Sequence, residues 1–573
     1  MATALTLENA GKVPASEPYY DLGEYTWPVC TQVHDAQIWF DRGLLWVYSF
    51  NHRESAACFR QVILHDPDCA MGYWGAAFAT GPNYNKVWQA FDPKDLKESV
   101  AKCYDWSRKA KELSDKASVA EQAIIEALQH RFPAREPPGD FTPSVRAYAD
   151  AMREANLQLG AGNLDIITLA ADALMNMAPW KLYEAGTGEP NLATPVLEVK
   201  TILESGLQHP RADRHPGILH MYIHCVEMSK TPQLALRTAD NLRKLVPDGG
   251  HITHMSSHID VLVGDYRRAM HTNIQATMAD DRYYAREGGK NFYTFYRMHN
   301  YHSLIYGAMM AGNSRVALEA TDRMESTLSD DILLINSPPM ADWVEFFTSV
   351  RVHVLIRFGM WDRLKRLPLP ENKQLYCVTT AMMHYGKGIA WAATRNVQNA
   401  DRERELFREA AKRVPVTRMD FPNKVVDELE IATAMLDGEI EYRRGNYKVA
   451  FERLQLAVAK DDALIYSEPW GWMLPTRHPY AALLLEQGHV AEAAQIYAED
   501  LGLDGKLVRA HQHPNNIWAL KGYYECLQRL GRTAEANIIL SNLNIAEAGA
   551  DMTIRSSCFC RLGTAPGPSL AAT

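Results

Sequence analysis

The histidines of this chain are concentrated in one stretch. Ten of its twenty histidines fall between His209 and His302, about a sixth of the sequence. Three short strings carry most of them: HPGILHMYIH at 215–224, HITHMSSH at 251–258 and HNYH at 299–302. Spacings of three and four residues place side chains on one face of an α-helix. Since imidazole is the commonest metal ligand in proteins, this stretch predicts a metal site.

The best-aligned histidines form three pairs that we expect to converge on one point. They are His220, His224, His254, His258, His299 and His302. His251 belongs to the same ligand set. His215, just before Pro216, is expected at a helix start and is a further candidate ligand. So many imidazoles exceed the needs of one tetrahedral ion, which leaves open two ions, or one ion with histidines for acid–base work. All-nitrogen ligation suits copper, iron or zinc, and copper is the first choice.

Two carboxylates are predicted to share in the chemistry of this site. Glu227 follows the first string, and Asp172 lies in the preceding segment ITLAADALMNM. Each could ligate a metal, orient an imidazole through its second nitrogen, or act as a general base.

Polar and aromatic side chains near turns are expected to line a substrate pocket. They are His52, Asn83, Tyr84, Asn176, Trp180, Tyr466, Trp470 and Arg477. The alternative is that the aromatic members only pack repeats together. Isolated histidines such as His353 and His511 are expected to be surface or hydrogen-bonded core residues. The metalloprotease His-Glu-x-x-His, Cys-x-x-Cys, Gly-x-Ser-x-Gly and nucleotide-binding patterns are all missing.

Helix pairs are the elements that must position these residues. Residues 36–70 show the aromatic and small-residue period of a helix-turn-helix unit of ~34 residues and resemble a tetratricopeptide repeat. Glycine-punctuated turns followed by amphipathic helices recur at 263–277, 311–324, 443–462, 486–503 and 529–543. Strand signals are nearly absent. The predicted fold class is all-α, a tetratricopeptide-repeat-like superhelix (α-solenoid) of antiparallel helix pairs with a concave interior.

The predicted organisation is one repeat array between two irregular ends. Residues 1–18 are expected to be a flexible leader, 19–548 a continuous array with the histidine-rich region 209–302, and 549–573 a disordered tail. The nine cysteines are scattered and odd in number, so we expect free thiols, most of them buried.

Charge and hydropathy narrow the choice of partners. The net charge is −9 with no basic stripe, which argues against nucleic acid as a partner. No apolar run is long enough for a membrane span, and the first residues lack the features of a secretory signal. A soluble, cytoplasmic protein with a small-molecule substrate is expected, with the oligomeric state open.

Several motifs together resemble a family of large tetratricopeptide-repeat proteins of bacteria and fungi. They are FNH at 50–52, GPNYN at 81–85, the three histidine strings and WALKGYYECLQRLGRTAEA at 518–536. In that family the first string is followed by a His-x-x-His-x-x-x-His string, which is intact here at 251, 254 and 258. The resemblance implies a metal-type pocket and attaches no reaction to it. Asp172 matches an acidic position of the family.

Three functions are compatible with these observations. The first is a metal-dependent enzyme that oxidises a small organic substrate with copper or iron. The second is a zinc hydrolase or lyase on the same histidines, with Glu227 or Asp172 as general base. The third is a non-enzymatic repeat scaffold that binds a peptide or protein.

Overall fold

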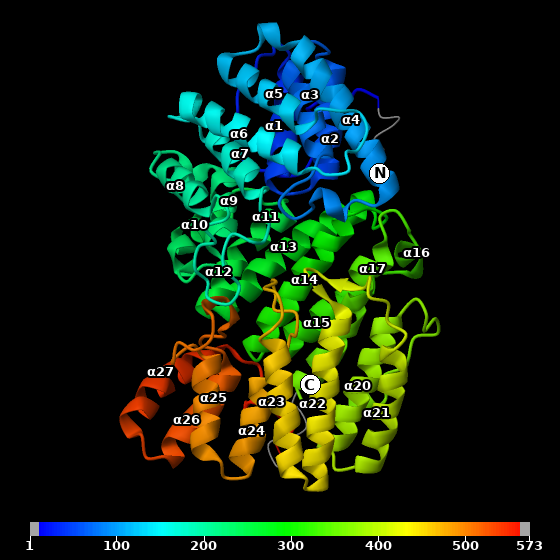
Figure 1. Ribbon diagram of the computed structural model, residues 1–573, viewed down its shortest axis with the longest axis vertical. Coiled ribbons are helices and arrows are strands. Elements are labelled where there is room, and N and C mark those ends of the chain that lie inside the picture. Colours follow the sequence, from blue (N-terminus) through cyan, green and yellow to red (C-terminus); the bar gives the residue numbers. More distant parts are fainter. Residues whose placement is uncertain (1–10, 562–573) are drawn as a thin grey trace. The chain divides into compact units, whose positions relative to one another are not determined.

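Helices make up most of the chain. The computed structural model describes residues 11–561, and these fall into two compact units (Figure 1). Unit 1 consists of Met1–Ile259 and Thr272–Arg297, and unit 2 of Asp260–His271 and Met298–Thr573. The boundary therefore cuts through three helices, α12, α13 and α14.

Unit 1 is a succession of helices, of which the first nine each pack on the next helix in the chain. They are α1 (His34–Tyr48), α2 (His52–His65), α3 (Ala70–Thr80), α4 (Pro93–Glu112), α5 (Val119–Arg131), α6 (Thr142–Leu159), α7 (Leu164–Met175), α8 (Val196–Gly206), α9 (Pro216–Val226), α10 (Leu236–Leu242), α11 (Gly250–His254), and the parts of α12 (Ser256–Val263), α13 (Tyr266–Glu287) and α14 (Tyr293–Met310) within it. The first helix also contacts α9, which brings the end of the first repeat to the first histidine string.

Unit 2 is also built of packed helices. It contains α15 (Ser314–Glu325), α16 (Asp330–Leu333), α17 (Met340–Val344), α18 (Val350–Arg357), α19 (Trp361–Lys365), α20 (Cys377–Ala393), α21 (Val397–Ala411), α22 (Val425–Arg444), α23 (Tyr447–Asp461), α24 (Arg477–Glu486), α25 (Val490–Asp500), α26 (Ile517–Arg529) and α27 (Thr533–Gly549). The strands β1 (Met419–Asp420) and β2 (Asn423–Lys424) pair antiparallel in a two-residue hairpin. The all-α, tetratricopeptide-like class of helix pairs is confirmed within each unit.

The predicted glycine turns are confirmed in backbone detail. All five glycines have positive φ, between 70° and 84°, the left-handed conformation that closes a helix cheaply only at glycine. They are Gly264, Gly312, Gly445, Gly488 and Gly531. The first repeat also needs a glycine for close packing. A Cβ on Gly75 would lie only 2.2 Å from the Phe59 ring.

The predicted flexible leader and disordered tail need correction where the structure describes them. The Val13 amide donates to Gln61 at 2.8 Å, and its carbonyl accepts from Trp39 at 3.0 Å, so residues 11–18 pack on α1 and α2. Near the other end, Ser557 is buried and its hydroxyl donates to the His478 carbonyl at 2.9 Å. Composition alone missed these anchors, and residues 1–10 and 562–573 lie outside the described part.

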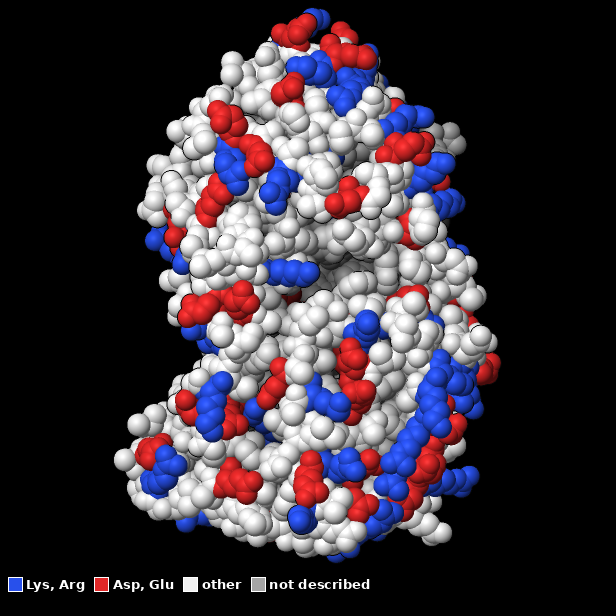
Figure 2. All heavy atoms as spheres, viewed as in Figure 1, with Lys and Arg blue, Asp and Glu red and all other residues white. Residues whose placement is uncertain are grey.

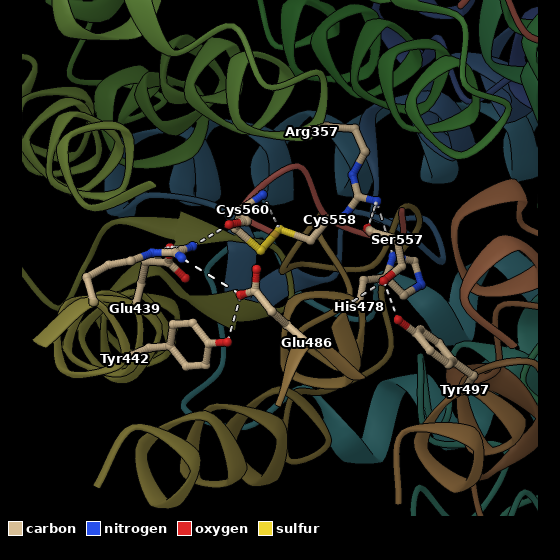
Figure 3. The surroundings of a disulfide bond; sticks show 10 residues. Arg357, Glu439, Tyr442, His478, Glu486, Tyr497, Ser557, Cys558 and Cys560 are labelled. Carbon is tan, nitrogen blue, oxygen red and sulfur yellow. Dashed lines mark hydrogen bonds and ion pairs between the residues drawn. A yellow bond between two sulfur atoms is a disulfide. The ribbon is translucent and has the colours of Figure 1, made fainter. Parts of the chain in front are cut away.

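Two cysteines near the C-terminus are bonded, against the expectation of free thiols. Cys558 and Cys560 form a disulfide inside unit 2 (Figure 3). The Arg357 guanidinium donates to the Ser557 carbonyl beside it at 3.2 Å. The other seven cysteines are free, and all but Cys30 are buried, as expected.

Surface charge is mixed on the face shown in Figure 2, where basic and acidic side chains alternate over α21. Arg408 lies 3.1 Å from Asp437 of α22, and Arg404 lies 2.9 Å from Asp401. None of the helices between residues 11 and 561 combines the length and apolar character of a membrane span.

Candidate metal centre

Three short helices, α9, α11 and α12, bring five imidazoles of unit 1 together. The α9 helix starts at Pro216, with His215 as its N-cap accepting from the Ile218 amide at 3.1 Å. This start places His220 and His224 one turn apart on a single face, with ring centroids 4.9 Å apart.

The second string supplies the other three rings from α11 and α12. The His251 centroid lies 5.3 Å from that of His220 and 5.9 Å from that of His254. The His258 centroid lies 4.6 Å from that of His254 and 6.0 Å from that of His224. All five side chains are at most 4% exposed. The convergence predicted for these five histidines is therefore present within one unit.

Hydrogen bonds fix the orientation of four of the rings through Nδ1. His224 Nδ1 lies 2.8 Å from Glu227 Oε1, and His258 Nδ1 lies 2.7 Å from Glu227 Oε2. His220 Nδ1 lies 2.6 Å from the Tyr48 carbonyl, and His254 Nδ1 lies 2.7 Å from Asn273 Oδ1. Because these partners accept hydrogen bonds, each Nδ1 carries a proton and each Nε2 presents a lone pair.

The Nε2 atoms of the first pair point into the cluster without a protein partner. Among the described residues, neither His220 Nε2 nor His224 Nε2 has a hydrogen-bond partner, although both are buried. One ligand atom each from His220, His224 and His251 lies within 4.8 Å of the other two. Buried polar atoms are rarely left in this state, and a bound ion would satisfy them.

The second pair has a related feature. His254 Nε2 and His258 Nε2 are 2.7 Å apart. With both Nδ1 atoms donating to Asn273 and Glu227, two lone pairs face each other; a tautomer in which one ring donates from Nε2 removes this repulsion, and so does a cation held by both nitrogens. A proton or a metal ion would serve.

Burial keeps these imidazoles neutral, which is the form that ligates metals. It lowers the pKa of His224 to about 3 and those of His254 and His258 to about 4. The pKa of His220 is also well below its usual value, through burial first and then the His224 charge. Burial raises the pKa of Glu227, and the neighbouring His258 lowers it.

Aromatic rings enclose the imidazoles on one side. Phe50 stacks on His224 and His251 with centroids 5.9 and 5.2 Å away. Tyr84 and Trp180 lie 5.2 and 5.7 Å from His224. Phe50 and Trp180 have positive φ values of 55° and 61°, a conformation that costs a bulky residue energy and often marks functional sites.

The remaining pocket residues predicted in unit 1 have mostly structural contacts. Asn83 Oδ1 accepts from the amides of Asn85 and Lys86 at 2.9 and 2.7 Å and shapes its turn. Asn176 Nδ2 donates to the carboxylate of Asp172 at 3.0 Å. The half-buried His52 ring lies 6.3 Å from that of Phe50. Tyr84 and Trp180 are the predicted pocket residues that reach the imidazoles.

The two predicted catalytic carboxylates differ in their surroundings. Glu227 is fully buried and uses both oxygens to hold imidazoles, so its geometry is that of an orienting group. Burial raises the pKa of Asp172 to about 6, and Arg131 opposes that rise. Among the described residues Asp172 Oδ2 has no hydrogen-bond partner, so this carboxylate retains an oxygen for proton transfer.

Other predicted residues lie in unit 2, and His302 is one of them. Its Nε2 lies 2.9 Å from Met473 Sδ, and its ring packs 5.3 Å from that of Phe347. His302 Nε2 is thus bonded within unit 2, and a role for His302 beside the imidazoles of unit 1 stays a prediction. His299, on the same helix α14 and also assigned to unit 2, stays a prediction.

The predicted pocket residues of the C-terminal half are also in unit 2. Trp470 Nε1 donates to Asp461 Oδ1 at 2.7 Å, and Arg477 donates to Asp462 at 2.6 Å. Tyr466 is buried in the same unit. Trp470 and Arg477 line a small cavity of unit 2, and their role in a substrate pocket stays a prediction.

Some residues of the centre were not predicted from the sequence. Phe50 occupies the turn after α1 at a φ of 55°, as Arg395 does in the turn after α20 at 62°, so its place in a turn carries no signal of a site. Tyr296, whose ring lies 4.9 Å from that of His251, and Asn273 have ordinary positions in helices and no such signal. Nothing in the sequence marks the backbone carbonyl of Tyr48 either.

Comparisons with known proteins add no assignment. No family model matches the chain, and no curated protein matches it. The human IFIT1 dimer with m7Gppp-AAAA is similar at 10% identity and a TM-score of 0.32, over 88% of this chain and 94% of that one. Ypp1 is similar at 9% identity and a TM-score of 0.30, over 92% of this chain and 82% of that one. The APC/C hetero-tetramer Cut9-Hcn1 is similar at 11% identity and a TM-score of 0.26, over 83% of this chain and 88% of that one. Likenesses of this size assign no function.

Proposed function

We propose that the imidazole cluster of unit 1 binds a transition metal and that the protein is a metal-dependent enzyme. The observation that carries this proposal is the pair of buried Nε2 atoms, on His220 and His224, that lack a protein partner while their Nδ1 atoms are fixed. Fixing one imidazole nitrogen with a carboxylate or carbonyl is the usual support of a metal-ligating histidine.

The donor chemistry favours copper, with iron and zinc as alternatives. All five side chains offer nitrogen, and nitrogen ligands suit these three metals better than magnesium or calcium. A copper or iron ion would supply one-electron chemistry and oxygen activation. The chain's own contribution is to hold the rings through Glu227, Asn273 and the Tyr48 carbonyl, and to exclude water with Phe50, Tyr84 and Trp180.

Oxidation of a small organic substrate is the reaction we propose. The aromatic wall beside His224 and His251 gives apolar contact for such a molecule, and Asp172 is a group that can accept a proton near neutral pH. One or two ions are compatible with five imidazoles.

A zinc hydrolase is the closest rival. In that case the general base would be Asp172, because Glu227 is occupied by His224 and His258. The pKa of Asp172, raised to about 6 by burial, suits a base that works at neutral pH.

A non-enzymatic binding scaffold is the alternative that the helix-pair fold itself favours. Both units are built of paired helices, and such arrays commonly bind peptides on a concave surface. A scaffold has no evident need for five buried imidazoles in one cluster. If this alternative holds, replacing His254 and His258 abolishes no catalytic activity, while a partner is lost in a pull-down.

Metal analysis of protein purified without chelators tests the proposal. We expect at least one equivalent of transition metal per chain, and an optical or paramagnetic signal if it is copper or iron. Stoichiometric metal without a signal would indicate zinc. Protein that stays below stoichiometric metal even after reconstitution would contradict the proposal.

A further inference from the structure

Residues 554–561 form a strap without helical structure that packs on the helices of unit 2 (Figure 3). Five of its eight residues are at most 3% exposed, among them Ile554 and Phe559. A non-helical segment that is buried to this extent needs partners elsewhere for its backbone groups. The contacts of the strap therefore decide whether it stays in place.

Ser557, the residue before the first cysteine, is held by three helices. Its hydroxyl donates to the His478 carbonyl of α24 at 2.9 Å and lies 2.5 Å from the Tyr497 hydroxyl of α25. Its carbonyl accepts from the Arg357 guanidinium of α18 at 3.2 Å. These bonds position the turn that follows.

Phe559 lies between the two bonded cysteines and is the apolar anchor of that turn. Its ring packs edge-on against Trp518 of α26, with centroids 5.7 Å apart. On another side it meets Gly359, where an added Cβ would lie only 2.9 Å from the Phe559 Cβ. Arg443 of α22 donates to the Cys560 carbonyl. The turn closed by the disulfide is thus the one that inserts Phe559.

The disulfide closes a very short loop, since Cys558 and Cys560 are two positions apart. A cross-link stabilises a fold mainly by restricting the unfolded chain, and this gain grows with the length of the loop. The bond therefore does little for the stability of unit 2 as a whole. Its effect is local, on a turn in which the Cys560 amide also donates to Cys558 Sγ at 3.1 Å.

We propose that the Cys558–Cys560 disulfide is a redox latch: oxidised, it holds the strap in unit 2, and reduced by a dithiol, it releases the strap. The other seven cysteines are free, so this pair is the disulfide that a reductant would meet in the described chain. The latch concerns unit 2 alone and does not rest on the metal centre proposed for unit 1.

Reduction is a thiol–disulfide exchange with the dithiol. One thiolate of the dithiol attacks Cys558 Sγ, because Cys558 is half-buried whereas Cys560 is only 3% exposed. The S–S bond breaks, and its electron pair leaves on Cys560 Sγ, which takes up a proton. The second thiolate of the dithiol then displaces Cys558 Sγ, which is protonated in turn. The dithiol ends as a disulfide, and the strap has gained two electrons and two protons.

The two thiols need more room than the bonded sulfurs, because they separate to non-bonded contact. The turn from Cys558 to Cys560 must then widen. Phe559 cannot follow this movement in place, since Gly359 and Trp518 pack closely against it. Loss of this apolar anchor leaves the strap with its polar contacts alone, for which water competes.

Hydrogen exchange of the full-length protein in oxidised and in reduced dithiothreitol tests the latch. We expect the amides of residues 554–561 to exchange at least about tenfold faster after reduction, as in a local opening, and those of α20 and α21 to be unchanged. Alkylation and mass spectrometry of the same samples count the thiols at Cys558 and Cys560. Equal exchange of the strap in the bonded and reduced proteins would overturn the proposal, as would a disulfide that the dithiol cannot reduce in the folded protein.

Three variants separate the latch from other effects of the reductant. Cys558→Ser with Cys560→Ser should show fast exchange of the strap in both buffers. Phe559→Ala should show it in the oxidised buffer with the disulfide intact. Cys526→Ser, which changes a buried free thiol of α26, should respond to the dithiol like the wild type. A double serine variant whose strap stays as protected as in the oxidised wild type, or faster exchange that extends through α20 and α21 on reduction, would show that the disulfide is no latch.

Discussion

Each unit contains a buried carboxylate that holds two imidazoles. In unit 1, Glu227 holds His224 and His258 at 2.8 and 2.7 Å. In unit 2, Asp500 holds His478 and His513, both at 2.9 Å. The two carboxylates are equally inaccessible, each 0% exposed. Composition and burial alone would give the two clusters the same interpretation.

The second ring nitrogens of His478 and His224 distinguish the two clusters. His478 Nδ1 accepts from the Arg357 guanidinium at 3.2 Å, and Asp500 also accepts from Asn516 Nδ2 at 3.0 Å. Protein groups therefore occupy both nitrogens of His478. In unit 1, His224 Nε2 is unpaired within the described chain. A histidine–carboxylate cluster therefore indicates a metal site only when ligand nitrogens lack a protein partner.

Replacing one histidine of each cluster should give the largest difference between the two units. His224→Asn is expected to reduce transition-metal affinity by more than about a hundredfold, because a ligand is worth more than the 10–100-fold of an outer partner. His478→Asn should leave metal content unchanged. Isothermal titration with the native metal measures both. Equal loss in the two variants would mean that the effect is one of folding.

Asp500→Asn tests whether the histidine–carboxylate cluster of unit 2 stabilises the fold. Burial would raise the pKa of Asp500, but His478 and His513 outweigh it and hold the pKa well below its usual range. Removing the carboxylate charge should cost unit 2 about 3–5 kcal/mol. Hydrogen exchange of α24 and α26 reports the loss, with metal binding in unit 1 unaffected. A variant as stable as wild type would contradict the assigned role.

Glu227→Gln tests the corresponding position in unit 1. An amide cannot accept from both imidazoles, so the ring orientation is lost while the ligand nitrogens remain. We expect metal affinity to fall about 10–100-fold, with the stoichiometry kept. Competition with a chelator measures this change. Unchanged affinity would show that Glu227 does not position the ligands.

Asp172→Asn should have the smallest effect, and one that depends on pH. The folded pKa of about 6 lies above the unfolded value of about 3.9. Stability from the protonated folded form is therefore present at low pH and is lost as pH rises through 6. Between pH 5 and 8 the wild type should lose about 1 kcal/mol relative to the variant. Denaturant unfolding of both proteins at the two pH values checks the difference.

Much of the fold follows from local signals in the sequence. Glycine turns such as Gly445 and Gly488 specify helix ends by backbone conformation alone. The Pro216 start of α9 likewise fixes the face that carries His220 and His224. Such features depend on a few neighbouring residues, so one sequence suffices to find them.

The parts of the site that sequence reasoning missed depend on tertiary packing. Spacing predicts which face of α14 carries His302, but not that this part of the helix belongs to unit 2 beside Met473. The acceptors Asn273 and the Tyr48 carbonyl come from distant positions in the chain. Ser557 shows the same limit, since a polar residue in a tail of small residues is buried through long-range contacts.

X-ray absorption at the edge of the bound metal tests the central claim most directly. For protein loaded with its native metal, we expect a first shell of at least three nitrogen ligands at about 2.0 Å with the multiple scattering of imidazole. The imidazole contribution should decrease in His224→Asn and persist in His478→Asn. A first shell of oxygen or sulfur alone, or a spectrum that His224→Asn leaves unchanged, would contradict a metal centre on the histidines of unit 1.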